Sequence, residues 1–193
     1  MLFNSISFLL FLPIVFVVYW WVNKKKLSLQ NGLLLLASYF FYACWDWRFL
    51  FLLLFSTALD YFTGIKMAEA KNQGRKKVWF WLSIIVNLGV LGAFKYYNFF
   101  ADSFAEVLSE LGIQANFWTL KVILPVGISF YTFHGLSYVI DIYKERIEPE
   151  RNIVTYSLFV AYFPLLVAGP IERATHLLPQ IKKRRFFDYP KAI

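Results

Sequence analysis

Runs of uncharged, apolar residues alternate with short polar stretches along the whole chain. Charged side chains are absent from residues 1–23, 27–45, 78–94, 122–140 and 152–171. Each run is 17 to 23 residues long, and an α-helix of roughly 20 residues crosses a hydrocarbon core about 30 Å thick. The pattern predicts an all-α polytopic membrane protein with spans at about 3–22, 29–45, 48–65, 78–97 and 120–141.

The polar stretches between the runs indicate which ends of the spans face the cytoplasm. "NKKK" at 23–26 and the five Lys or Arg residues of 66–77 are typical of cytoplasmic connections, because short cytoplasmic loops carry an excess of basic residues. The N-terminus is therefore expected on the extracytoplasmic side, and a single membrane domain is expected to cover 1–193.

One polar stretch, residues 99–111, has the pattern of an amphipathic helix. Phe100, Phe104 and Val107 fall on one helical face, whereas Asp102 and Glu106 fall on the other. This pattern favours a helix that lies at the outer membrane interface.

The last two apolar stretches, 120–141 and 152–171, contain residues that interrupt helices, namely Pro125, Gly127, Pro164, Gly169 and Pro170. If both stretches crossed completely, the tail with "KKRR" at 182–185 would lie outside, against its basic charge. Non-helical backbone is tolerated at membrane depth only where protein or a water-filled cavity covers it. We therefore expect 152–171 to be re-entrant, although a complete crossing stays open, and we expect both stretches to line a cavity.

The composition excludes several other classes of protein. Hydrophobic residues make up 59% of the chain and charged residues 17%, whereas a soluble domain is about 45–50% apolar. The net charge of +8 does not indicate a nucleic-acid partner, because the basic residues lie between apolar spans where membrane topology explains them. Membrane lipid is the partner that this composition predicts.

Recognisable sites for metals, phosphates or covalent catalysis are missing from the sequence. There is no glycine-rich phosphate loop, no HExxH and no GxSxG motif. Two histidines and one cysteine argue against a metal site, and Cys44 cannot form an internal disulfide. No bound cofactor is expected.

Polar side chains inside the apolar runs are candidates for function, because placing them in a membrane is costly. They are Asp60, Ser129, Tyr131, Thr132, His134, Ser137, Asp141, Glu172, Arg173 and His176. Structural interpretations stay open as well. Asp60 can pair with a loop lysine, His134 can be a hydrogen-bonded core histidine, and Ser or Thr can bond to their own helix backbone.

Two longer motifs carry more specific information. "LPVGISFYTFHGLSYVIDIYK" at 124–144 and "FPLLVAGPIERATHLLPQI" at 163–181 closely resemble the membrane-bound O-acyltransferase (MBOAT) family, in particular its branch of bacterial alginate O-acetyltransferase membrane subunits. "FNSISFLLFLPIVFVVYW" at 3–20 and "DYFTG" at 60–64 are similar to that branch too, so the resemblance covers essentially the whole chain.

The resemblance implies a multi-helix ring around a central funnel in the bacterial inner membrane. An acetyl group from a cytoplasmic donor, such as acetyl-CoA or an acyl carrier, would reach an extracytoplasmic polysaccharide acceptor, often by way of an esterase-like acetyltransferase partner. A dry cavity suits acyl transfer, because it strengthens electrostatic stabilisation of the oxyanion and keeps water from a reactive thioester.

The resemblance also implies roles for individual residues. The family's catalytic histidine lies beyond residue 193, so the chain is expected to be an incomplete, inactive part of such an enzyme, with no catalytic residue of its own. His134 occupies a position where relatives often carry glutamine, which places it in the funnel wall. Glu172 and Arg173 are expected to tie their segment to the ring or to meet the donor's polar head. The candidate wall residues are Pro125, Gly127, Ser129, Tyr131, His134 and Asp141, and the second motif contributes Pro164, Gly169, Pro170, Glu172, Arg173 and His176.

Two other functions fit parts of the pattern. A non-catalytic docking or structural membrane protein would need no catalytic histidine. A small-solute transporter would use broken helices and buried polar groups, but the chain contains no internal repeat, and Asp60 is the only formal charge well inside a predicted span.

Overall fold

The computed structural model describes residues 4–23, 26–110 and 123–185, and within these ranges the chain is helical throughout, without strands. The described helices are α1 (Ile6–Asn23), α2 (Leu27–Ala43), α3 (Trp47–Ala68), α4 (Gln73–Glu110), α5 (Ile128–Tyr143), α6 (Ile153–Ala161), α7 (Phe163–Ala168) and α8 (Ala174–Lys182). Two of them are long and apolar enough to cross a membrane, namely α3 and the part of α4 from Gln73 to Leu108. The all-α fold is confirmed for the described residues.

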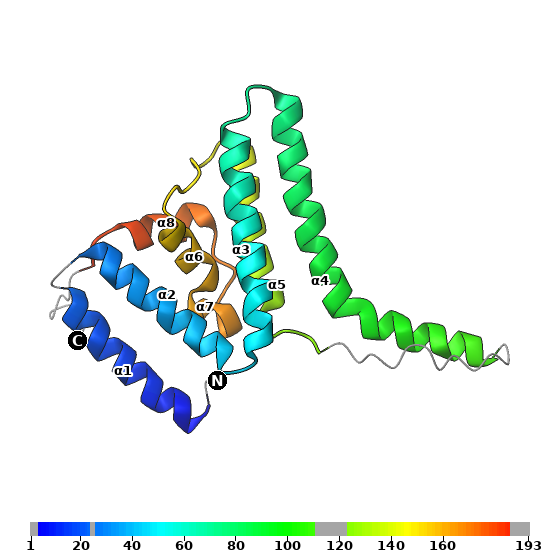
Figure 1. The fold of residues 1–193 in the computed structure, drawn as a ribbon, viewed down its shortest axis with the longest axis horizontal. Coiled ribbons are helices and arrows are strands. Elements are labelled where there is room, and N and C mark those ends of the chain that lie inside the picture. The colour runs from blue at the N-terminus through cyan, green and yellow to red at the C-terminus, as the bar shows by residue number, and fades with distance from the viewer. Residues whose placement is uncertain (1–3, 24–25, 111–122, 186–193) are drawn as a thin grey trace.

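Helices α3, α4 and α5 each pack against the other two, and α6, α7 and α8 lie between this group and the pair α1 and α2 (Figure 1). The α2–α3 turn at residues 44–46 is closed by Asp46, whose carboxylate accepts a hydrogen bond from the backbone N–H of Arg48 at 3.0 Å and so caps α3. Asn152 caps α6 in the same way, through the backbone N–H of Thr155.

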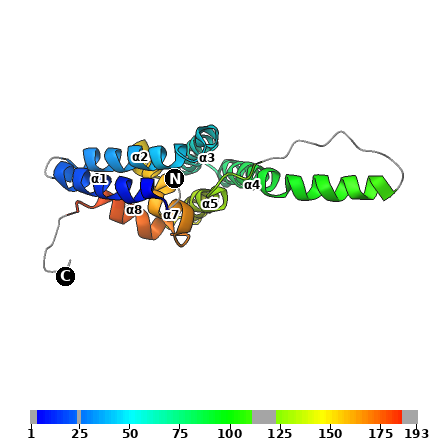
Figure 2. The same ribbon diagram turned by 90° about the horizontal axis from the view of Figure 1, so that it is seen from below.

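Helix α4 differs from the sequence expectation of a span at 78–97 and a separate helix at 99–111. The structure has one helix from Gln73 to Glu110, and residue 111 lies outside the described residues. No proline interrupts 73–110, so the backbone hydrogen bonds continue through the polar stretch. At 38 residues the helix would be about 57 Å long if straight, but it bends, and its last part extends away from the other helices (Figures 1 and 2).

Helix α5 is shorter than the predicted span at 120–141. It begins only at Ile128, after a turn that contains Pro125 and Gly127, and residues 120–122 lie outside the described part. Gly127 has a φ of 77°, a conformation that glycine adopts at little cost. The breakers therefore end the helix rather than bend it.

The segment from α6 to α8 runs along α5 toward the turn at Gly127 and then returns toward the other end of α5. On the way down, the rings of Tyr156 and Tyr138 lie 4.4 Å apart and those of Phe159 and His134 lie 5.6 Å apart. Leu166 of α7 then reaches the turn at Gly127. On the way back, the N–H of Glu172 meets His134 and Lys182 pairs with Glu150, which follows the end of α5. Residues 152 and 182 therefore lie at the same end of α5.

Polar groups from several parts of the chain meet at this end, which we call the basic end. It comprises the end of α1 and the start of α2, the α3–α4 connection with the first turn of α4, residues 144–152, and the end of α8 with the residues up to 185. Lys182 lies 2.8 Å from Glu150, and Lys76 lies 2.5 Å from Glu145. Arg185 donates hydrogen bonds to the Tyr19 hydroxyl at 3.0 Å and to the Asn31 side-chain oxygen at 2.5 Å. Arg185 and Lys182 are thus held by the protein, which the basic character of 182–185 alone does not indicate.

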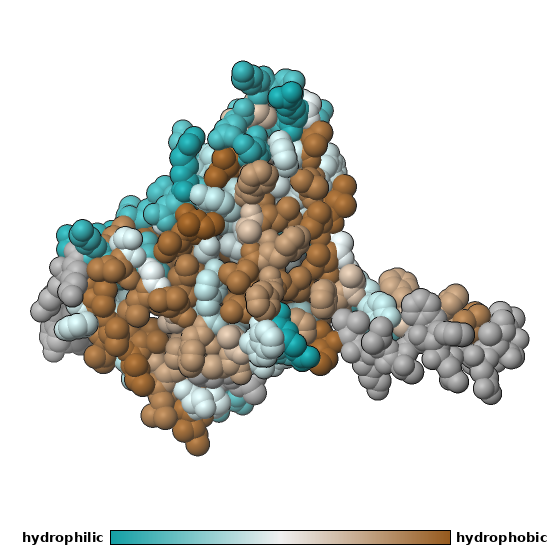
Figure 3. Space-filling model, viewed as in Figure 1, coloured by the Kyte–Doolittle hydropathy of each residue, from teal (hydrophilic) through white to brown (hydrophobic). Residues whose placement is uncertain are grey.

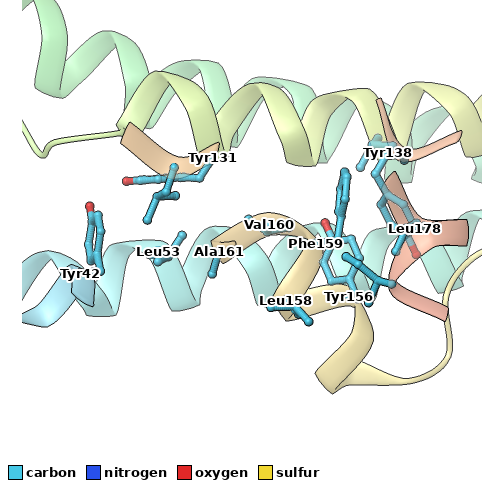
Figure 4. Packing of buried hydrophobic residues seen from close by; sticks show 14 of the residues in the cluster. Tyr42, Leu53, Tyr131, Tyr138, Tyr156, Leu158, Phe159, Val160, Ala161 and Leu178 are labelled. Atoms are coloured by element: carbon cyan, nitrogen blue, oxygen red, sulfur yellow. The ribbon is translucent and has the colours of Figure 1, made fainter. Parts of the chain in front are cut away.

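The interior is rich in aromatic residues that come from all three groups of helices (Figure 4). Tyr42, Leu53, Tyr131, Tyr138 and Phe159 are almost completely buried. Much of the outer surface is apolar as well, with Ile6 81% and Leu36 69% exposed. Figure 3 shows hydrophobic residues over the flanks of the helices and hydrophilic residues at the basic end. An exposed apolar surface of this extent is typical of proteins that contact lipid or a partner.

Candidate functional site

His134 is the point where the two motifs meet. Its side chain is completely buried on α5, and its Nε2 atom accepts a hydrogen bond from the backbone N–H of Glu172 at 3.2 Å. Because Nε2 accepts, a neutral ring carries its proton on Nδ1. Nδ1 is buried near the backbone of Val160 in α6, without a hydrogen bond of good geometry. The ring therefore links α5 to the returning segment through the Glu172 hydrogen bond, and it packs against Phe159 of α6.

This geometry predicts how substitutions of His134 affect stability. Glutamine can accept the Glu172 N–H through its side-chain oxygen, so His134→Gln should leave the unfolding temperature in detergent close to that of the wild type. Leucine has the right bulk but no acceptor, so His134→Leu should lower the free energy of unfolding by about 1–2 kcal/mol. His176→Leu is the matched control, because His176 is exposed and should tolerate the change. Equal unfolding temperatures for the leucine and glutamine variants at 134 would contradict the assigned hydrogen bond.

The turn before α5 packs directly on the helix break of the second motif. A Cβ atom on Gly127 would lie 2.5 Å from the carbonyl oxygen of Leu166 in α7. Pro125 is buried and lies close to this contact in the sequence, and Pro164 lies in the first turn of α7. An N–H group in the first turn has no partner within the helix, so a proline there removes no helix hydrogen bond. Gly169 follows α7 in an extended conformation. The breakers of the two motifs thus lie against each other.

The break between α6 and α7 is completed by α2. The backbone N–H of Phe163 donates a hydrogen bond to Ser38 Oγ at 3.2 Å, and the Ser38 hydroxyl donates to the Leu34 carbonyl at 2.7 Å. Ser38 is fully buried. The unpaired N–H at the start of α7 therefore obtains a partner from a neighbouring helix, as buried backbone groups require.

Several predicted site residues lie apart from this meeting point. Asp141 is buried and its Oδ1 atom lies 3.2 Å from Arg146. His176 is exposed, with Nδ1 2.7 Å from Glu172 Oε2. Arg173 is exposed at the start of α8, and Tyr131 packs edge to face on Tyr42. Within the described part of the chain, Ser129 and Pro170 have no side-chain contact that suggests a ligand, and the role of these two residues and of Gly169 in a funnel wall stays a prediction.

Pockets at the basic end are lined by other residues. One, of about 540 Å³, lies beside the α3–α4 connection, and its charged lining residues are Lys71, Lys76, Glu145, Arg146 and Glu148. A second, of about 190 Å³, lies beside α8. The hydrogen bond from Lys76, together with its charge, lowers the pKa of the Glu145 carboxyl below its usual range. The candidate wall residues do not line either pocket, so a cavity along the two motifs stays a prediction.

The structure adds a buried polar cluster that the sequence analysis missed. Asp60 Oδ1 accepts hydrogen bonds from Ser83 Oγ at 2.6 Å and from Asn87 Nδ2 at 2.7 Å, and Ser56 Oγ donates to Asn87 Oδ1 at 2.7 Å. The suggested pairing of Asp60 with a loop lysine is wrong, because the carboxyl lies inside the α3–α4 interface. A signal was present, since Ser56 and Asp60, like Ser83 and Asn87, are four residues apart and share a helix face.

Curated bacterial proteins match almost the whole chain. A probable alginate O-acetylase AlgI of Pseudomonas aeruginosa is 42% identical over 186 residues, which cover 95% of this chain and 35% of the relative. The corresponding protein of Azotobacter vinelandii is 40% identical over 187 residues, or 95% and 36%. A peptidoglycan O-acetyltransferase of Helicobacter pylori is 34% identical over 211 residues, or 95% and 39%.

The matches cover almost all of this chain but only part of each relative. The chain spans little more than a third of the length of these relatives. No protein-family model and no solved structure matches it. The chain is homologous to the alginate O-acetylases and to the peptidoglycan O-acetyltransferase, which confirms its resemblance to the membrane-bound O-acyltransferase family.

Proposed function

We propose that this chain forms the amino-terminal part of a bacterial membrane O-acetyltransferase. The enzyme would move an acetyl group from a cytoplasmic donor, such as acetyl-CoA or an acyl carrier, to an extracytoplasmic polysaccharide. The observation that carries the proposal is the identity of 42% over 95% of the chain with a probable alginate O-acetylase. That match is long enough to include both motifs around His134 and Glu172.

Within this enzyme the chain supplies part of the funnel wall and of the helical scaffold, but it does not supply the catalytic base. His134 is buried and holds a backbone N–H, and a residue in that role is not free to abstract a proton from an acceptor. The His176 side chain is exposed on the surface of α8. The catalytic histidine and the remaining wall of a central funnel would come from sequence outside residues 1–193. The esterase-like partner and the polysaccharide would contact the extracytoplasmic side.

The proposed membrane topology places the basic end in the cytoplasm. Short cytoplasmic connections are rich in lysine and arginine, and Lys182, Lys76 and Arg185 gather at this end. The return of the chain from Leu166 to Lys182 along α5 supports a re-entrant segment at 152–171. The last part of α4, with Phe100 and Phe104 exposed, would lie along the outer interface.

Cysteine labelling in intact cells and inverted vesicles tests this topology. Lys183→Cys in a Cys44→Ser background should react with a membrane-impermeant maleimide only in inverted vesicles. The native Cys44 is exposed in the α2–α3 turn at the opposite end and is the matched control, because it should react only in intact cells. Labelling of the Lys183→Cys variant in intact cells would refute the re-entrant arrangement.

A hybrid protein tests the acetyltransferase function directly. Residues 1–193 would replace the matching third of the Pseudomonas aeruginosa relative, in cells that lack that relative. Acetylated alginate should be restored by the hybrid, whereas residues 1–193 expressed alone should restore none, because the proposal assigns the catalytic histidine to sequence outside residues 1–193. A hybrid that reaches the membrane in normal amounts but yields no acetylation would refute the proposal. Restoration by 1–193 alone would refute the assignment of a scaffold role.

A further inference from the structure

The cluster around Asp60 is unusual because it contains an acidic group without a cationic partner. The Asp60 side chain is 1% exposed, in the middle of α3. Its two hydrogen-bond donors, Ser83 Oγ and Asn87 Nδ2, are both neutral and both bind Oδ1. Among the described residues, no lysine, arginine or histidine bonds to this carboxyl.

The second oxygen of the carboxyl, Oδ2, is buried and has no hydrogen-bond partner among the described residues. It faces Gly135 of α5, where a Cβ atom would collide with it. Helix α5 therefore approaches α3 closely at Gly135, where a glycine hydrogen points at Oδ2. The ionisable side chains close to Asp60 are the phenols of Tyr138 and Tyr156, and these provide no positive charge.

An ionised carboxylate in such a place would be costly. A buried charge without a paired cation loses its hydration, and neutral hydrogen bonds replace only part of it. A neutral carboxylic acid costs less in this site, because its carbonyl oxygen can accept both hydrogen bonds and its buried hydroxyl group, although it has no acceptor among the described residues, carries no charge. Both donors bind Oδ1, which therefore corresponds to the carbonyl oxygen.

We propose that Asp60 is held as the neutral acid, with its proton on Oδ2, and that it acts as a positioning residue which fixes α3, α4 and α5 against one another. Ser83 and Asn87 attach the carboxyl to α4, and Gly135 allows α5 to close over it. Because Gly135 follows His134 directly, this contact also sets the rotation of α5 that directs His134 toward the Glu172 N–H. The inference concerns the helix bundle and does not depend on acetyl transfer.

Infrared spectroscopy of the purified chain in detergent tests the protonation state. With ¹³C-labelled aspartate, the wild type at neutral pH should show the carbonyl band of a protonated carboxylic acid, shifted by the label. Asp60→Asn should lose this band. Asp141→Asn is the matched control, because Asp141 is equally buried but pairs with Arg146, and it should keep the band. Absence of the band from the labelled wild type would overturn the proposal even if every variant failed to fold.

Thermal unfolding provides the second measurement. Asparagine is neutral and nearly the same shape as aspartic acid, so Asp60→Asn should unfold close to the wild-type temperature. Asp60→Leu cannot accept from Ser83 and Asn87 and should lose most of its cooperative transition. If Asp60→Asn were as unstable as Asp60→Leu, the folded chain would require the ionised carboxylate, and the proposal would fail.

Discussion

Replacing Gly135 with alanine should destabilise the helix bundle by about 2–4 kcal/mol. The added Cβ would collide with Asp60 Oδ2 and lie 3.0 Å from Asp60 Cγ. Asp60 cannot rotate away without losing its hydrogen bonds to Ser83 and Asn87, and α5 cannot retreat without opening the core. Overpacking costs about 1–3 kcal/mol, and a lost buried hydrogen bond adds about 1 kcal/mol. Chemical or thermal unfolding in detergent would measure the loss.

Gly32→Ala is the matched control for this substitution. A Cβ atom on Gly32 in α2 would meet nothing within 4 Å, and glycine inside a helix is less stable than alanine by about 0.5–1 kcal/mol. The control should therefore unfold at the wild-type temperature or above it. A Gly135→Ala variant that matched this control would mean that α5 does not lie against Asp60.

Replacing Gly127 with alanine should have an effect of similar size for a different reason. The φ of 77° costs a residue with a Cβ atom roughly 1–2 kcal/mol. The new Cβ would also lie 2.5 Å from the Leu166 carbonyl oxygen, which belongs to backbone and cannot rotate away. With the overpacking included, we expect a total loss of about 3 kcal/mol in the free energy of unfolding, and loss of acetylation in the hybrid protein.

Gly89→Ala is the comparison for Gly127. Gly89 lies on the exposed side of α4, where a Cβ atom would meet nothing within 4 Å, so its replacement should be neutral or slightly stabilising. Wild-type stability of the Gly127→Ala variant would show that the turn before α5 and the start of α7 can separate freely.

Much of the helix arrangement could be predicted from the spacing of charges. Helices α1, α2 and α3 begin and end within three residues of the predicted apolar spans, because uncharged runs of about 20 residues leave few other folds open. The breaks at Gly127 and Pro164 could also be predicted, since proline and glycine act locally. The resemblance to O-acyltransferases likewise rested on contiguous motifs.

The features that escaped prediction depend on contacts between distant residues. Asn87 is 27 residues from Asp60, and Glu172 is 38 residues from His134. Which polar groups meet depends on the rotation of each helix about its axis. The pattern of apolar and charged residues alone does not predict that rotation. The continuity of α4 was missed for another reason. Charged residues after Tyr97 indicated a membrane boundary, but a helix does not have to end where its surroundings change.

The break between α6 and α7 has a consequence for the order in which the protein is made. Helix α6 has nine residues and is too short to enter a bilayer independently. Its continuation needs Ser38 of α2 and the turn at Gly127 of α5. Both are synthesised earlier than residue 153. The residues that contact this segment are therefore already part of the chain when the segment leaves the ribosome. The same segment, delivered first, would meet lipid with its backbone N–H groups unpaired.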